Sequence, residues 1–197
     1  MPLPRYDLAT LVDLLRAEEI SRHDTNVTAA VAILLREGRD GEAEVFFIQR
    51  AEREGDLWSG HMAFPGGRRD ATDADPVATA IRETAEEVGL DLARDATLLR
   101  RLDDVPIMIR KPAVDIRVAP FVFAMRRDAP HALNHEVADV LWTPIGPMAR
   151  GALSSVYPFE WQGHAHELPC YKIGDRVIWG LTYMMLDGLF GALHRGA

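Results

Sequence analysis

The chain has 197 residues, of which 48% are hydrophobic and 26% are charged. These proportions are those of an ordinary soluble globular protein, and the length suits a single domain over residues 1–197. The formal net charge of −8 at pH 7 argues against a nucleic-acid or membrane-surface binder, although bound metal ions would let an acidic protein accept an anionic small substrate. The lone Cys170, an N-terminus without a hydrophobic signal region and the absence of a long apolar run predict a cytoplasmic protein.

The beginning of the chain predicts a helix followed by a β-hairpin. Within an N-terminal region of residues 1–24, residues 7–22 have helical periodicity with Asp7 as the N-cap, and we interpret this helix as a packing or dimer element. Residues 26–35 form an apolar, β-rich run that is typical of a buried strand. A polar turn with two glycines separates this run from a second strand at residues 45–50, so the pair predicts a hairpin.

A short helix with defined ends is predicted over residues 76–88. Asp75 is a good N-cap, Pro76 stands where a missing N–H is tolerated, and Gly89 follows the last periodic residue. The apolar residues that fall on one side of this helix are Val77, Ala78, Ile81, Ala85 and Val88. The carboxylates that fall on the opposite side, within an arc of about 100°, are Glu83, Glu86 and Glu87.

These carboxylates destabilise an isolated helix by a few tenths of a kcal/mol per pair, and Arg82 offsets only one of them. A hard divalent cation, Mg²⁺ or Mn²⁺, would turn this cost into a gain, because it prefers carboxylate oxygens and keeps positions open for water and phosphate. The alternative is a solvated acidic helix face without a ligand. The preceding residues favour the metal, because two adjacent glycines let the backbone approach a ligand closely. These residues are Phe64, Pro65, Gly66 and Gly67.

The rest of the chain predicts further strands and a last helix. Strands are expected over residues 97–108 and 115–125, with a loop at 109–112 whose basic residues Arg110 and Lys111 could face the ligand. The remaining expectations are a strand over residues 136–142, a short helix over 146–155, short strands and turns over 157–177, and a helix from 178 to about 193.

The region of residues 66–90 resembles the signature of the Nudix hydrolases. The residues that match it in order are Arg82, Glu83, Glu86, Glu87, Gly89 and Leu90. The sequence departs from the general pattern in three ways. Gly67 and Arg82 enclose 14 residues, one more than usual, Asp73 or Ala74 stands where a spacer glutamate is expected, and Thr84 replaces an aliphatic residue. The longer spacer, the Phe-Pro-Gly-Gly segment and a Trp-Gly-x-Thr segment at residues 179–182 are similar to the coenzyme A diphosphatase-like branch of the family.

The resemblance implies a Nudix-type α/β/α sandwich with a mixed central sheet, and a divalent metal site. By this resemblance Glu83, Glu86 and Glu87 hold Mg²⁺ or Mn²⁺, and the backbone of Gly67 closes the site. Arg82 is expected to orient the glutamates by ion pairing. Glu136 is the candidate for an additional acidic residue, with an edge charge that blunts a strand as the alternative. The general base is then Glu83 or Glu136, and the sequence leaves both open.

The implied activity is hydrolysis of a nucleoside diphosphate linked to another group, with coenzyme A or acyl-coenzyme A as the leading substrate. The alternatives are ADP-ribose, nucleotide-sugars or nucleoside triphosphates as substrates, and a Nudix-fold module that senses a nucleotide without cleaving it. Similar proteins include homodimers, so a second copy of the chain is a candidate partner. The residues expected to contact the substrate are Arg50, Arg53, Arg68, Arg69 and Phe64, with a solvated surface arginine as the alternative for each arginine.

Overall fold

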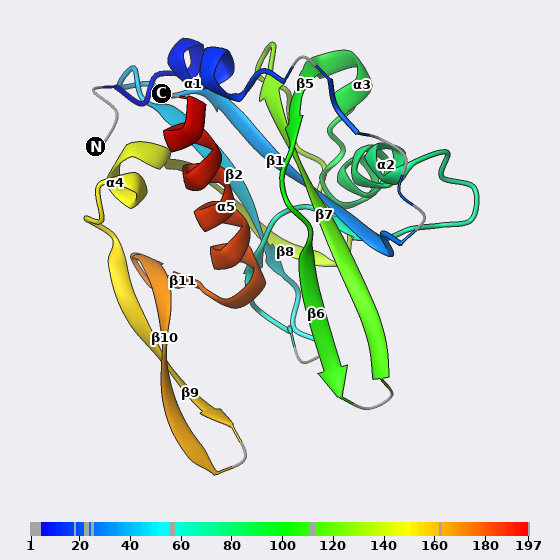
Figure 1. Ribbon diagram of the computed structural model, residues 1–197, viewed down its shortest axis with the longest axis vertical. Coiled ribbons are helices and arrows are strands. Elements are labelled where there is room, and N and C mark those ends of the chain that lie inside the picture. Colours follow the sequence, from blue (N-terminus) through cyan, green and yellow to red (C-terminus); the bar gives the residue numbers. More distant parts are fainter. Residues whose placement is uncertain are drawn as a thin grey trace.

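The computed structural model describes residues 5–17, 19–21, 24, 26–55, 58–110, 113–161 and 163–196. A mixed sheet of eight strands forms the centre, with helices on both of its faces (Figure 1). The chain therefore adopts the expected α/β/α sandwich. No helix in the described part of the chain is both long and apolar enough to cross a membrane.

The sheet is built around β1, which lies between a parallel and an antiparallel neighbour. The order along the sheet is β3-β2-β1-β7-β5, while β4 pairs with β1, β6 with β7 and β8 with β2. Only the pair of β1 and β7 is parallel among the described strand pairs of this sheet. The bounds are β1 Ala29–Glu37, β2 Ala43–Arg50, β3 Met62–Ala63, β4 Gly66–Arg68, β5 Ala96–Arg101, β6 Val105–Arg110, β7 Ala113–Met125 and β8 Val137–Pro144.

The central position of β1 explains why its residues 29–35 are an unbroken apolar run, because both faces of this part of the strand are largely buried. Ile33 and Leu35 pack into the core beneath α1 and α5, whereas Ala32 and Leu34 pack into the core beneath α2. The helices are α1 Leu8–Leu15, α2 Pro76–Val88, α3 Leu92–Asp95, α4 Ile145–Ala149 and α5 Gly180–Gly196.

A second sheet follows α4 and extends away from the sandwich. Strands β9 (Ser154–Trp161) and β10 (His164–Ile173) form a long antiparallel hairpin, and β11 (Arg176–Ile178) pairs with β10. The β6–β7 hairpin extends in the same direction, so that two hairpins project beside one another below the sandwich (Figure 1).

Several expected elements have different bounds. The N-terminal helix ends at Leu15 rather than continuing to residue 22, and part of the 1–24 region lies outside the described residues. The strand expected over residues 97–108 is two strands, because the chain leaves the sheet at residues 102–104. The helix expected over 146–155 is the shorter α4. The short strands and turns expected over 157–177 are mostly the long β9–β10 hairpin, which is followed by a turn and the short strand β11. Residues 111–112 of the expected basic loop lie outside the described residues, and residues 109–110 belong to β6.

Candidate active site

The predicted ends of α2 are confirmed, and they fix where its glutamates lie. The Asp75 carboxylate accepts a hydrogen bond from the Ala78 N–H at 2.8 Å, and Pro76 is the first helical residue. Gly89 ends the helix in the left-handed conformation with φ 71°, and its N–H donates to the Ala85 carbonyl at 3.0 Å. Because both caps are formed by local residues, the helix begins and ends where the sequence predicts.

The glycine pair of β4 lets the backbone come close to both β1 and α2. Gly66 lies opposite Val31 with φ 149°, and a Cβ atom at this position would stand 2.5 Å from the Val31 Cα. A Cβ atom at Gly67 would stand 2.5 Å from the carboxyl carbon of Glu83. Neither space is available to a side chain, so the Glu83 carboxyl group rests directly against the β4 backbone.

Glu87 is buried, although the helical pattern placed it on the side opposite the apolar residues. The residue is 3% exposed, and one carboxylate oxygen accepts a hydrogen bond from the Gly66 N–H at 2.9 Å. Burial raises the pKa of this carboxyl group to about 7, and the nearby negative charge of Glu83 acts in the same direction. The buried face of α2 includes Ala80 and Thr84, whereas Ala85, expected on that face, is exposed. Glu87 therefore lies within the buried face, Glu83 lies at its edge and Glu86 is on the exposed side.

Arg82 forms the expected ion pairs with two of the glutamates. One of its nitrogens donates to Glu83 at 2.9 Å and to Glu86 at 3.1 Å. Burial raises the pKa of Glu83, and the hydrogen bond from Arg82 acts against this shift. Glu86 is the most exposed of the three, with 55% of its side chain accessible. Arg82 thus fixes the positions of two carboxylates that would otherwise repel each other.

Asp73 holds the other side of Arg82, a role that the sequence did not assign to it. Its two carboxylate oxygens accept from two nitrogens of Arg82 at 3.0 and 2.9 Å, and one of them also accepts from the Thr79 hydroxyl at 2.9 Å. The hydrogen bonds from Arg82 lower the pKa of Asp73 to about 2. Asp73, rather than Ala74, therefore supplies the carboxylate of the spacer. The sequence signal was the Asp in the long spacer, but one sequence could not fix the alignment.

Glu136, immediately before β8, is near enough to the glutamates of α2 to affect their pKa values. Its charge contributes to the raised pKa values of both Glu83 and Glu87. Its carboxylate accepts a hydrogen bond from Arg53 at 3.1 Å, and both side chains are about two-fifths exposed. The structure therefore brings Glu136 toward the acidic cluster and pairs it with Arg53, an arginine that had been expected at the substrate.

A cavity of about 540 Å³ opens beside the glycine pair. Of the residues expected at the substrate, Arg50, Arg68 and Phe64 line it together with Gly66 and Gly67. Arg50 also lies close enough to Glu87 to lower its pKa slightly against the effect of burial.

The remaining arginine, Arg69, is directed elsewhere. Its guanidinium donates to the carbonyl oxygens of Asp24 and Asp73, each at 3.4 Å, and it is absent from the described lining of the cavity. Trp179 and Thr182 do line the cavity. The sequence had marked them as part of a segment similar to the coenzyme A diphosphatase-like branch, at the start of the last helix, and not as site residues.

The acidic cluster is not a preassembled metal cage. Among the residues that the structure describes, no three His, Cys, Asp or Glu side chains converge closely enough to hold an ion. Several of these carboxylates are instead paired with cations, since Arg82 holds Glu83 and Glu86, and Arg53 holds Glu136. The donor set nevertheless fits Mg²⁺ or Mn²⁺, because these ions prefer carboxylate oxygens. One of the carboxylates, Glu87, is buried and has a raised pKa. The neighbouring glycine has no side chain that would keep the backbone away from an ion.

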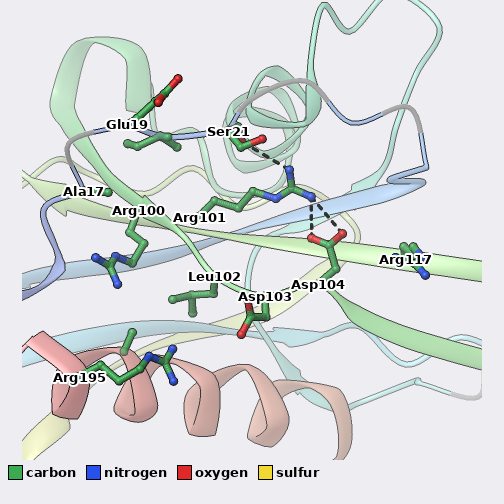
Figure 2. A pocket seen from close by; sticks show the side chains of 12 residues that line it. Ala17, Glu19, Ser21, Arg100, Arg101, Leu102, Asp103, Asp104, Arg117 and Arg195 are labelled. Carbon is green, nitrogen blue, oxygen red and sulfur yellow. Dashed lines mark hydrogen bonds and ion pairs between the residues drawn. The ribbon is translucent and has the colours of Figure 1, made fainter.

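A second cavity, of about 620 Å³, lies between the segment after α1, the β5–β6 connection and the C-terminal end of α5 (Figure 2). It is rich in arginines, but its described lining also contains three carboxylates. Arg101 donates to both oxygens of Asp104, at 2.8 and 3.0 Å, and to the Ser21 carbonyl oxygen at 3.4 Å. None of the predicted site residues lines this cavity, so the candidate active site is the cavity beside the glycine pair.

Comparison with known proteins decides the family. Residues 26–161, more than two thirds of the chain, match the family model described as the NUDIX domain. The chain belongs to the Nudix family. Nudix hydrolase 22, chloroplastic, of Arabidopsis thaliana is 33% identical over 168 residues, which cover 80% of this chain and 52% of that protein. Mitochondrial coenzyme A diphosphatase NUDT8 of Homo sapiens is 29% identical over 163 residues, which cover 81% of this chain and 66% of that protein.

The first curated relatives are longer than this chain, which spans about half the length of the plant proteins that it matches. Among solved structures, a Nudix hydrolase from M. smegmatis, RenU, superposes with a TM-score of 0.51 at 22% identity, covering 69% of this chain and 81% of that one. The C. elegans Ap4A hydrolase superposes with the same TM-score at 20% identity, covering 63% of this chain and 93% of that one. At these identities the likeness concerns the fold.

Proposed function

We propose that this Nudix protein is a divalent-metal-dependent hydrolase that cleaves the diphosphate of a nucleoside diphosphate linked to another group. The observation that carries the proposal is the position of the acidic cluster. The glycine pair that lines the cavity contacts the carboxylates of Glu83 and Glu87, and Arg50 and Arg68 line the same cavity. The carboxylates themselves are not among the described lining residues, so the glycine pair connects these cation-binding groups with the guanidinium groups that can bind phosphates in the cavity.

Glu83, Glu86 and Glu87 would hold Mg²⁺ or Mn²⁺, with the Gly67 backbone beside them. When bound, the ion supplies Lewis acidity, which neutralises phosphate charge and makes water a stronger acid. Arg82 and Asp73 keep the carboxylates in place, and Arg50 and Arg68 orient the diphosphate. A carboxylate accepts the proton of the attacking water, and the bond between one phosphorus and the bridging oxygen breaks.

Glu83 and Glu136 are the two candidates for this base. Glu83 contacts the glycine pair, whereas Glu136 is more exposed and pairs with Arg53. The variants Glu83→Gln and Glu136→Gln separate them through the pH profile of kcat. The variant that lacks the base loses the acidic limb of the profile, and the other variant keeps it at a changed height.

Coenzyme A or an acyl-coenzyme A is the substrate that we favour within this class. A relative that bears the name coenzyme A diphosphatase aligns over most of the chain, and the Phe-Pro-Gly-Gly segment is similar to that branch. The products would be 3′,5′-ADP and 4′-phosphopantetheine or its acyl derivative. The possible homodimer and a cytoplasmic location stay predictions, and relatives named mitochondrial and chloroplastic make the location a question for the whole protein.

The test is product analysis by mass spectrometry after incubation with Mg²⁺ or Mn²⁺. The panel contains coenzyme A, acetyl-coenzyme A, ADP-ribose, a nucleotide-sugar and a nucleoside triphosphate, with Glu86→Gln as the matched inactive control. Release of 3′,5′-ADP from coenzyme A compounds well above the other products supports the full proposal. Preference for another compound keeps the hydrolase and removes coenzyme A. Binding without cleavage of any compound contradicts the hydrolase and favours a sensing module.

A further inference from the structure

The candidate active-site cavity has two chemically different parts. Its charged lining residues, among those that the structure describes, are Arg50 and Arg68. Both belong to the end of the cavity beside the glycine pair, because Arg50 acts electrostatically on Glu87 and Arg68 follows Gly67 in β4. The other lining residues are mostly aliphatic or aromatic and come from elements that are distant in sequence. Among them are Ile107, Ile116, Phe159, Trp179 and Leu181.

This apolar part lies between the two projecting hairpins. Ile107 and Ile116 are paired across the β6–β7 hairpin and form one wall. Phe159 of β9 and Trp179, between β11 and α5, form an aromatic wall with 5.4 Å between their ring centroids, and Leu181 at the start of α5 also lines the cavity. The long β9–β10 hairpin thus contributes to the cavity as well as extending from the sandwich (Figure 1).

The aromatic wall is already packed in its place. The Trp179 ring stacks on Tyr157 with 4.4 Å between ring centroids and an interplanar angle of 22°, and it meets His61 edge-on at 5.0 Å. The Thr182 hydroxyl, one of the polar groups in the lining, donates to the Met62 carbonyl at 3.0 Å. A ligand that enters this part therefore meets a preformed apolar surface with few polar groups to pair with.

We propose that the apolar part of this cavity binds an extended aliphatic chain attached to the far side of the substrate's diphosphate. This inference rests on the proposed function, because it places the diphosphate at the glycine pair. A sugar or a second nucleotide would bury more hydroxyl groups without partners on the same surface than a mainly aliphatic chain would. The cavity of about 540 Å³ holds on the order of ten methylene-sized groups, taking roughly the volume of a liquid water molecule for each.

The probe is a series of ADP n-alkyl esters, which assumes no coenzyme A moiety. Over chains of about two to ten carbons, each methylene that enters the cavity should raise kcat/KM roughly fourfold. The variants Ile107→Gln and Leu181→Gln, at half-buried positions in the lining, should flatten this dependence. Met184→Gln is the matched control, because Met184 is on α5 at 51% exposure and is not part of the described lining.

Binding of the same esters, measured by calorimetry, separates this inference from the proposed function. If the esters bind more tightly with length but are not cleaved, the aliphatic site stands and the hydrolase proposal fails. If they are cleaved at rates that do not depend on length, the hydrolase stands and the aliphatic site is overturned. An unchanged chain-length dependence in both lining variants, with correct folding shown by circular dichroism, also overturns it, because the chain then lies elsewhere.

Discussion

Glu87 combines a cost in stability with an expected role in metal binding, and the variant Glu87→Gln separates the two. In the metal-free protein the buried carboxylate of Glu87 lies near other carboxylates. Among the contacts described, its hydrogen-bond donor is one backbone N–H, that of Gly66. Glutamine has nearly the same shape, its amide oxygen can accept the same hydrogen bond from Gly66, and it carries no charge. The variant should therefore be more stable than the metal-free parent and much less active.

The size of the stability gain follows from the pKa. Burial raises the pKa of Glu87 from 4.5 to about 7, so ionising the folded protein costs about 3 kcal/mol more than ionising the unfolded chain. Above about pH 8 the group is ionised in both states, and Glu87→Gln should raise the free energy of unfolding by up to that amount. At about pH 4 the folded parent is already protonated, so the difference between the two proteins should nearly disappear.

Urea unfolding in the presence of a chelator measures this difference at both pH values, and hydrolysis with Mg²⁺ measures activity. We expect turnover to fall by at least about 100-fold. Mutating the groups that hydrogen-bond to a metal ligand costs up to about 100-fold in activity, and losing the ligand itself should cost no less. Glu86→Gln is the matched control, since its side chain is 55% exposed. This control should change stability little while also lowering turnover. A Glu87→Gln variant that is less stable at pH 8, or that keeps parental activity, would refute the reasoning.

Three further outcomes follow from the same contacts. Relative to Glu87→Gln, the metal-free parent should lose stability as the pH rises from 4.5 to about 7. The raised pKa makes the folded parent bind more protons than the unfolded chain in this range. Urea midpoints measured across the range check the sign of this change. Gly67→Ala should displace the Glu83 carboxyl group, whose carbon would stand 2.5 Å from the new Cβ, and so reduce kcat by tenfold or more while circular dichroism stays native. Asp73→Asn should cost about 2 kcal/mol in urea unfolding at neutral pH, and this cost should vanish as the pH falls toward 2, where the parent carboxylate also becomes protonated.

Local signals explain which features the sequence could predict. The caps of α2 come from Asp75 and Gly89, which act within one turn of their own positions, so the helix bounds follow directly from the residues. The fully apolar run of β1 likewise required a position at the centre of a sheet. The pairing of Arg82 with Glu86 follows from helical spacing alone, and the structure contains it.

Features that depend on distant contacts could not be read in the same way. Glu87 is buried because β4, more than twenty residues earlier, covers it, and a helical wheel carries no information about that strand. The interruption at residues 102–104 separates two strands that both pair with β7, a fact visible only in the sheet. The wall containing Trp179 depends on the hairpin of β9 and β10, whose alternating pattern is weak because most of its side chains are exposed.

Hydrolysis of coenzyme A in ¹⁸O-labelled water, with Mg²⁺ present, tests the central claim most directly. The account predicts that one product, either 3′,5′-ADP or 4′-phosphopantetheine, gains a single labelled oxygen on its phosphate, because water attacks one phosphorus and the bridging oxygen leaves with the other. It also predicts that Glu86→Gln and Glu87→Gln nearly abolish this product. Cleavage elsewhere in the molecule, or labelled product formed by both variants at the parental rate, would contradict the assignment of the α2 carboxylates as the catalytic metal site.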